Sequence, residues 1–578
     1  MSAPRFPIRT YVSTRTWRLA GLAAGFFLLT SCASLPTETQ PLPPEKRAYG
    51  NFLAGEWASQ HANFPTAVDF LQEAYRQAPD SEAVAHRLFL EHLRQGRLSQ
   101  AKTVAKSLRA DPVMAPLANF VIGTHALARR DFKAAQAAYA ETGSLGSAGS
   151  AGPILGAWAH LGPGDVEAAL KTLEHVPAKD DAFVLTTKAR ILDMAGRWEE
   201  AEAEYAALWQ ARLLTAHNVV AFGHLLERLG RVDEAEEIYT TFTAAYGVHP
   251  RVIEALNTLG QKPKRTEDDV RVGASMSIFG PAAAMTATAD VDVAMILLHM
   301  ALELNPDLDA ARVLLAEVLS QRGALESAQK VITEVPKDSV YYSSAVSVQA
   351  FALRRMGDVD GAIGILKSGL TQEPANTRML AALADVYRVE SRFAESEATL
   401  NRLLHLDDSQ TVYWMMRGMV RERLGKWDLA EKDLQYVIEV QPNNAEALNY
   451  LGYSWLDRGL HVDEAMDLIQ RAARLKPQSG AIRDSLGWAY YLQGDLERAV
   501  RELETAAALE PGDATVNHHL GDVYNALGRD QEAVWQWQRA LTLNPPAKER
   551  AELEQKLGAH RQGDESSAVP AVARAVGG

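Results

Sequence analysis

Hydrophobic and polar positions recur with a period of about 34 residues between Thr411 and Pro545. Each unit predicts two antiparallel helices, because small residues return at the places where the two backbones must approach most closely. The first helix has a glycine, at steps of 34, 35 and 34 residues, at Gly418, Gly452, Gly487 and Gly521. The second helix has an alanine, at Ala430, Ala465, Ala499 and Ala533. A proline closes each unit, at Pro442, Pro477, Pro511 and Pro545.

The ends of these helices are also marked in the sequence. Gly494 and Gly528 lie five residues before the alanine, where a left-handed cap favours glycine. Asp495 and Asp530 follow near the start of the second helix, where a carboxylate can accept the free N–H groups. The closing proline cannot continue the helical hydrogen bonds. These features are those of the tetratricopeptide repeat, and such units stack because none buries its apolar face alone. The expected fold is an all-α, right-handed solenoid.

The alanine of the second helix can be followed through most of the chain. It recurs at Ala67, Ala101, Ala135, Ala169, Ala201 and Ala235, then at Ala294, Ala328, Ala362 and, as a serine, Ser396. Cap glycines stand five residues earlier at Gly96, Gly196, Gly230, Gly323, Gly357 and Gly425. The pattern predicts about 14 repeats in total, with less regular units in the N-terminal half.

One long step divides the repeats into two arrays. The 59 residues from Ala235 to Ala294 contain the polar run at 260–269, so we place a joint at 260–274. The N-terminal array is then 48–259 and the C-terminal array 275–545. Residues 546–558 are expected to form a capping helix, followed by a disordered tail at 559–578. The glycine- and serine-rich residues 143–152 predict a loop, because a phosphate-binding loop needs a following Lys-Ser/Thr and a preceding strand.

Residues 1–31 have the pattern of an export signal. Four arginines precede an apolar run of eleven residues, from Leu19 to Leu29, which is too short to span a bilayer. The run ends Leu29-Thr30-Ser31-Cys32, which resembles the lipobox of bacterial lipoproteins, and Cys32 is the only cysteine in the chain. This resemblance implies lipidation of Cys32; the alternative is ordinary cleavage after Ala33, which would discard it.

The residues after Cys32 bear on where the protein is anchored. Ala33 and Ser34 follow without the aspartate of an inner-membrane retention signal, which favours the periplasmic face of the outer membrane. Residues 32–47 are rich in proline and predict an extended linker that could hold the fold about 40 Å from the bilayer.

The charge of the chain disfavours nucleic acid as a partner. The formal net charge is −14, and without the four arginines of 1–31 it becomes −18, from 55 basic and 73 acidic residues. A nucleic-acid interface needs a basic face. The balance is compatible with a highly solvated scaffold.

No catalytic, metal or cofactor site is predicted. His518 and Asp522 are spaced to share an ion, but two ligands without a third are weak support for a metal site. The sequence contains no nucleophile elbow, no His-Glu-x-x-His and no Walker motif. A catalytic envelope enzyme is therefore disfavoured.

The concave surface of the C-terminal repeats is the candidate binding site. The fifth and ninth positions of the first helix face the groove of such an array, which predicts a partner groove lined by Met415, Met419, Asn449, Tyr453, Asp484, Trp488, His518 and Asp522. Methionine and aromatic side chains beside polar ones suit an extended peptide or a partner helix. The alternative is that Tyr453 and Trp488 pack against the neighbouring repeat. The residues do not match the Lys/Asn/Arg clamp that holds a C-terminal carboxylate in some repeats of this type.

The segment 411–545, with "LNYLGYSWLDRG", "DSLGWAYYLQG" and "HLGDVYNALGR", resembles large bacterial tetratricopeptide-repeat lipoproteins. These are similar to the outer-membrane lipoprotein adaptors of periplasmic carboxy-terminal processing proteases. The resemblance implies a non-catalytic, lipid-anchored adaptor that recruits such a protease, or a murein hydrolase, as its protein partner. The alternative is an assembly factor for an envelope secretion, pilus or exopolysaccharide export machine.

Overall fold

The computed structural model describes residues 44–61, 63–143, 145, 148–176, 181–261, 269–288 and 290–562. These residues form thirty α-helices and no β-strand, which confirms the all-α prediction. Fourteen antiparallel pairs account for α1 to α12 and α14 to α29, while α13 and α30 stand outside the pairing. Cys32 and the expected export signal lie outside the described residues, as do residues 563–578.

The first array is built from thirteen helices in the described part of the chain. Their bounds are α1 (Pro44–Gln60), α2 (Phe64–Gln77), α3 (Glu82–Arg94), α4 (Leu98–Leu108), α5 (Ala115–Ala128), α6 (Phe132–Ala140), α7 (Ala151–Leu161), α8 (Val166–Glu174), α9 (Ala182–Met194), α10 (Trp198–Gln210), α11 (Ala216–Arg228), α12 (Val232–Tyr246) and α13 (Pro250–Asn257). The last of these, α13, packs on α11 and α12 and has no partner helix of its own in the array.

The second array follows after the residues 262–268, which are outside the described part. Its bounds are α14 (Val270–Met285), α15 (Val291–Leu304), α16 (Asp309–Gln321), α17 (Leu325–Ile332), α18 (Tyr342–Arg355), α19 (Val359–Gln372), α20 (Thr377–Val389), α21 (Phe393–Leu406), α22 (Thr411–Arg423), α23 (Trp427–Val440), α24 (Ala445–Asp457), α25 (Val462–Leu475), α26 (Gly480–Leu492), α27 (Leu496–Leu509), α28 (Ala514–Ala526), α29 (Asp530–Thr542) and the terminal α30 (Ala547–Gln562).

Several bounds differ from those expected of the sequence. Helix α1 begins at Pro44, so residues 44–47 of the expected linker are helical. Helix α14 begins at Val270, inside the expected joint, and α30 continues to Gln562, past the expected end of the cap. Proline suits the first turn of a helix because the N–H it lacks has no partner there.

The small residues lie where the repeat requires them. All fourteen alanine or serine positions of the pattern fall in second helices and are buried. A Cβ built on Gly487 would approach the carbonyl oxygen of Ala499 to 3.2 Å, so a larger residue would push the two helices apart. Gly494 has φ +79, the left-handed conformation that glycine adopts without strain. Asp495 caps α27 by accepting the backbone N–H of Arg498.

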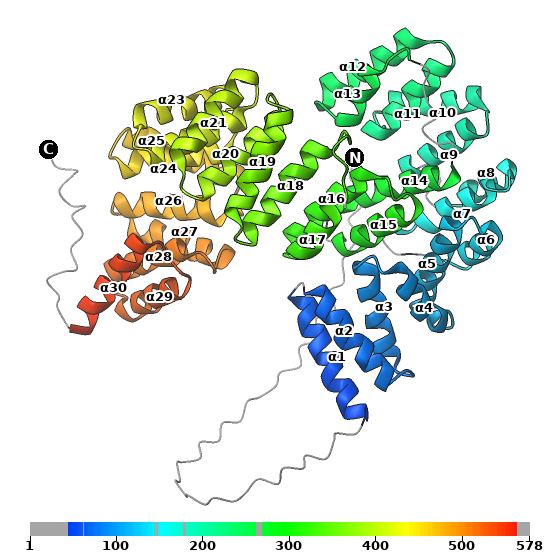
Figure 1. Ribbon diagram of the computed structural model, residues 1–578. Coiled ribbons are helices and arrows are strands. Elements are labelled where there is room, and N and C mark those ends of the chain that lie inside the picture. Colours follow the sequence, from blue (N-terminus) through cyan, green and yellow to red (C-terminus); the bar gives the residue numbers. More distant parts are fainter. Residues whose placement is uncertain are drawn as a thin grey trace, which may run out of the picture.

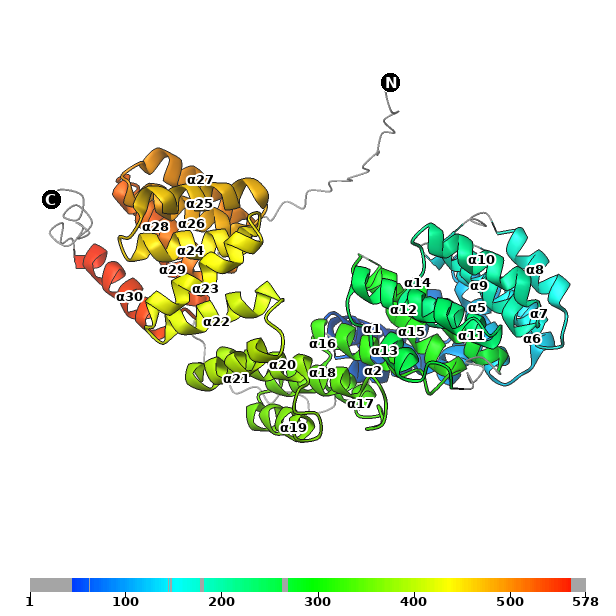
Figure 2. The same cartoon turned by 90° about the horizontal axis from the view of Figure 1, so that it is seen from above.

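The second array starts inside the curve of the first (Figure 1). Helix α14 packs on α7 and α9, and α15 packs on α3 and α5. Helices α3, α5, α7 and α9 are the first helices of their pairs, and the first helices form the concave side of the array. One buried apolar cluster therefore runs from Phe64 to Val348 and includes both returning helices. Figure 2 shows the rest of the second array extending away from this body.

Candidate functional site

The concave surface of the first array is filled by the chain itself. The indole Nε1 of Trp158 on α7 donates to Ser277 Oγ on α14 at 3.0 Å, and both side chains are buried. A Cβ on Gly273 of α14 would clash with the ring of Trp158, so glycine allows this helix to approach α7. Apolar packing and a buried hydrogen bond together make α14 part of the core rather than a loosely bound segment.

Charged pairs hold the second returning helix. Arg94 on α3 pairs with Asp292 at the start of α15 at 3.0 Å. His125 and Arg129 on α5 both contact Glu303, near the end of α15, at 3.1 and 3.2 Å. These pairs lie at opposite ends of α15 and fix its register along the groove. The first groove is thus not open to a partner segment.

The groove of the second array has the same construction without an occupant among the described residues. First helices contact one another along it, α18 with α20, α24 with α26 and α26 with α28, which places them on the concave side. Of the predicted groove residues, Met415, Met419, Asn449, Tyr453, Trp488 and Asp522 are half-buried, and Asp484 and His518 are buried. The predicted wall is therefore accessible in its central part and closed toward the end of the array.

A cluster of aromatic and charged side chains forms the middle of this wall. Trp488 on α26 lies between Tyr491, with ring centroids 4.8 Å apart, and His519 on α28, at 4.0 Å. His519 Nδ1 contacts both carboxylate oxygens of Asp484, at 2.9 and 3.0 Å. Trp488 thus packs on the neighbouring repeat, as the alternative interpretation held, and still presents part of its ring to the groove.

Burial and charge act in opposite directions on His519. Burial lowers its pKa, but the charge of Asp484 and the hydrogen bond to it outweigh burial, so that the pKa is raised above its usual value. The adjacent Tyr453 also has a raised pKa, because it is largely buried and because Asp484 and other carboxylates lie near it. The hydrogen bond to Asp484 thus favours the protonated form of His519.

Asn449 on α24 supplies a polar group to the same wall. Its Oδ1 has no hydrogen-bond partner in the structure and is shielded from solvent, although the residue is half-buried as a whole. A shielded acceptor without a donor costs free energy, about 1–3 kcal/mol.

The last two predicted groove residues are covered by α30. His518 Nδ1 contacts Glu549 at 3.1 Å, and the carboxylate of Asp522 accepts Lys556 Nζ at 2.6 Å. Asp522 also accepts the indole N–H of Trp537 at 2.9 Å. The two residues thus join the last repeat to its terminal helix. The described residues include no group of three or more His, Cys, Asp or Glu arranged to hold an ion.

A charged network behind Met415 and Met419 was not anticipated from the sequence. The buried carboxylate of Asp433 on α23 accepts Arg417 at 2.8 Å and Arg421 at 2.8 Å, both from α22. Arg421 also pairs with Glu397 on α21 at 3.1 Å. Arginines at i and i+4 of a helix share one face, which is the only signal in the sequence for this arrangement.

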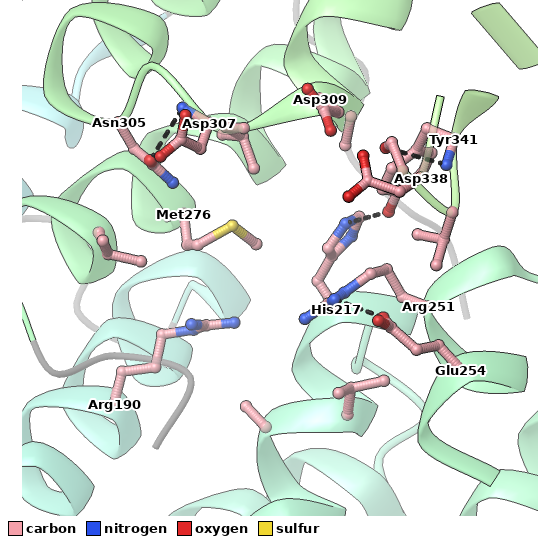
Figure 3. Close-up of a pocket in the computed structure, with 17 residues that line it drawn as sticks. Arg190, His217, Arg251, Glu254, Met276, Asn305, Asp307, Asp309, Asp338 and Tyr341 are labelled. Carbon is pink, nitrogen blue, oxygen red and sulfur yellow. Dashed lines mark hydrogen bonds and ion pairs between the residues drawn. The ribbon is translucent and has the colours of Figure 1, made fainter. Parts of the chain in front are cut away.

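A cavity of about 300 Å³ lies where the two arrays meet (Figure 3). Arg190 on α9 and Arg251 on α13 lie on one side of it. They face Asp307 and Asp338, in the loops before α16 and α18, and Asp309 at the start of α16.

Several groups around the cavity are paired within the chain. Arg190 donates to Asn218 Oδ1 at 2.9 Å and Arg251 pairs with Glu254 at 2.5 Å. The hydroxyl of Tyr341 contacts His217 Nε2 at 2.8 Å, and burial lowers the pKa of His217 to about 3. We interpret the cavity as a polar joint between the arrays.

None of the described helices, including apolar ones such as α15, has the length and hydropathy needed to cross a membrane.

Comparison with known proteins identifies the repeats in the second array. Models of the tetratricopeptide repeat match residues 353–420, 415–480 and 485–548. A TPR repeat-containing protein of Pseudomonas aeruginosa is 35% identical over 158 residues, which cover 24% of this chain and 26% of that protein. The human RNA polymerase II-associated protein 3 is 34% identical over 97 residues, 17% of this chain and 15% of that protein. The chain thus matches about a quarter or less of the length of these relatives.

Two solved structures that align with the chain have low TM-scores. The Cut9–Hcn1 hetero-tetramer of the APC/C aligns with a TM-score of 0.39 and 14% identity, covering 90% of this chain and 99% of that one. A tetratricopeptide repeat protein from Parabacteroides merdae aligns with a TM-score of 0.37 and 17% identity, covering 43% and 98%. The repeat models, the helix pairing and the buried small residues together establish a tetratricopeptide-repeat α-solenoid.

Proposed function

We propose that this protein is a non-catalytic scaffold that binds a protein partner through the groove of its second array. The partner is an envelope enzyme, either a periplasmic carboxy-terminal processing protease or a murein hydrolase. The scaffold is held at the periplasmic face of the outer membrane by lipid on Cys32. Repeats of this type imply protein partners in general, while the class of partner and the location rest on the lipobox and the resemblance described above.

The contrast between the two grooves is the observation that carries this proposal. In the first array, α14 and α15 occupy the concave side and share its core. In the second array, the corresponding side presents half-buried Tyr453, Trp488 and Met419 to solvent. Aromatic and methionine side chains are enriched at the centre of protein interfaces.

Crosslinking in the native envelope tests this proposal. The wild-type protein would be crosslinked, purified and its partners identified by mass spectrometry, beside a Tyr453→Ala/Trp488→Ala variant whose helicity and Tm are checked. The matched control is Trp535→Ala, which removes an exposed aromatic ring from α29, a second helix outside the concave wall. We expect a protease or murein hydrolase to be recovered with wild type and control, and to be lost at least tenfold with the double variant.

Other outcomes of this experiment decide against the proposal. Recovery of components of an export machine would assign the protein to assembly of that machine. Equal recovery of the enzyme with the double variant would place the interface outside the groove.

A further inference from the structure

The first helix of the solenoid has an exposed apolar stripe. In α1, Tyr49 is 66% exposed, Leu53 48% and Trp57 63%. The three residues are spaced by four, so they lie on one face of the helix. Among the described helices, α1 alone has three exposed large hydrophobic side chains. Single exposed apolar residues are ordinary, but an aligned set of three is not.

The opposite face of α1 makes the contacts with α2 and α3, which leaves this stripe exposed to solvent. Gly55 is buried against Leu71 of α2, and Ser59 donates to the carboxylate of Glu91 on α3 at 3.1 Å. Glu56 is directed to Arg87 on α3 and not to the exposed face. In the repeats that follow, a preceding unit covers the face that α1 leaves open.

We propose that the stripe on α1 docks in the headgroup layer of the lipid bilayer to which the protein is anchored. This inference rests on the proposed lipidation of Cys32. Eleven residues separate Cys32 from Pro44, so the start of α1 lies at most about 40 Å from the anchor. Helix α1 is the first of the described helices after Cys32 along the chain.

The chemistry of the stripe suits the interface of a bilayer. Tryptophan and tyrosine are the residues enriched at the level of the headgroups, because their rings are apolar and their N–H and O–H groups are polar. The exposed residues from Tyr49 to the end of α1 are uncharged, namely Tyr49, Gly50, Leu53, Trp57 and Gln60. The ring of His61 stacks on Trp57 with centroids 4.2 Å apart and holds the indole in position.

The size of the stripe favours a bilayer over a second copy of the chain. Its three side chains offer roughly 350 Å² of surface, judged from the area of aromatic side chains. A stable protein interface needs about 800 Å² from each partner. A small surface is sufficient against the bilayer, because the lipid anchor raises its effective concentration there. Docking would orient the solenoid on the membrane, which the anchor alone cannot do.

Spin labelling at single cysteines tests this proposal. Cys32 is the only natural cysteine, so a Leu53→Cys variant of the acylated full-length protein can be labelled with a nitroxide at one site. The labelled protein would be placed on vesicles of phosphatidylethanolamine and phosphatidylglycerol. Accessibility to oxygen and to a water-soluble nickel complex would then be measured. The control is Leu429→Cys on α23, which is 43% exposed and far along the chain.

On vesicles, we expect the nickel accessibility of the label at residue 53 to fall at least threefold and that of the label at residue 429 to change little. Adding Tyr49→Ser and Trp57→Ser should restore nickel access at 53 while the protein stays bound through its lipid. A label at 53 that remains in water on vesicle-bound wild type would overturn docking and leave the anchor intact. Dipolar broadening between labels at 53 would identify a second copy as the occupant and also overturn it. If the wild-type protein itself carries no acyl chain and stays in the supernatant, the anchor is rejected, and docking with it.

Discussion

Two buried carboxylates tie neighbouring helices together in the second array. Asp433 joins α23 to two arginines of α22, and Asp484 joins α26 to His519 of α28. Buried charges are tolerated in proteins only when they are paired and hydrogen-bonded. At both places the ion pair lies beside residues of the proposed partner groove, so the wall of the groove depends on it for its shape.

Replacing Asp433 should strongly destabilise the second array. Asp433→Asn leaves the mostly buried guanidinium of Arg417 without an anion and that of Arg421 with Glu397 alone. Removing one partner of a buried pair costs about 3–5 kcal/mol. Urea denaturation followed by circular dichroism should show this loss, whereas Glu439→Gln, an exposed change on the same helix, should stay within about 0.5 kcal/mol. Equal stability of the two variants would contradict the role given to Asp433.

The pair of His519 and Asp484 should make stability depend on pH. The pKa of His519 is raised in the folded protein, so its contribution is fully present below the unfolded pKa, about 6.5, and is lost as pH rises through the folded value. Asp484 of α26, Asp522 of α28 and Glu549 of α30 face the imidazole.

The neighbouring His518 has a lowered pKa, mainly through burial, and acts in the opposite sense. The measurement is therefore the difference in Tm between wild type and His519→Gln from pH 5.5 to 8.5. We expect this difference to shrink as pH rises, and a constant difference would show that His519 is uncharged in the fold.

At the scale of elements, the same type of groove is used in two ways. The first array encloses α14 and α15, and the second array ends under α30, where Leu553 and Leu557 are buried. In both cases a helix of the chain itself covers a surface that an open solenoid would leave exposed to solvent. Only the stretch between them keeps an uncovered concave wall in the described chain, which is why we place the partner there.

Adding a methyl group to α14 tests how tightly it is held. Gly273→Ala places a Cβ against the buried ring of Trp158, and overpacking of this kind costs about 1–3 kcal/mol. The matched control is Gly364→Ala on α19, where a Cβ meets nothing within 4 Å and should stabilise by about 0.5–1 kcal/mol. Thermal denaturation should therefore give shifts of opposite sign. A stabilising Gly273→Ala would mean that α14 is not packed on α7.

At the scale of the whole molecule, the described residues form three buried apolar clusters instead of one. The largest spans the first array and the returning helices, the second spans residues 346–420 and the third residues 434–557. Helix α22 lies between the last two clusters and buries only three of its residues, Thr411, Gly418 and Val420. Polar contacts, notably those of Asp433, therefore carry much of the connection at this place.

Unfolding of the full chain should consequently proceed in at least two steps. Repeat arrays interact mainly through nearest neighbours, and cooperativity weakens where that interface is polar. Hydrogen exchange in increasing urea should show residues 434–557 opening at a different urea concentration from α7, α9 and α14. Asp433→Asn should lower the midpoint of the second array and leave that of the first unchanged. A single transition for both regions would contradict this division.

Much of the repeat architecture could be read from the sequence. The positions of Gly487, Gly494 and Ala499 predicted close helix contacts and a left-handed cap, and both are confirmed. Such features are local, because each depends on a helix and its neighbour about 34 residues away. The fifth and ninth positions of each first helix could be assigned to the concave side for the same reason. Lipidation of Cys32 and its sorting remain predictions.

Which of those positions stay accessible depended on tertiary structure. Helix α15 is largely apolar, which indicates that it is buried, but nothing in its sequence names the surface that covers it. Its contacts with α3 arise only after the curvature of six repeats brings residues about 200 positions apart together. Likewise, Lys556 and Glu549 cover Asp522 and His518 only because α30 turns back on α28. The sequence determined the repeat and its faces, and the accumulated curvature of the solenoid decided which face is open.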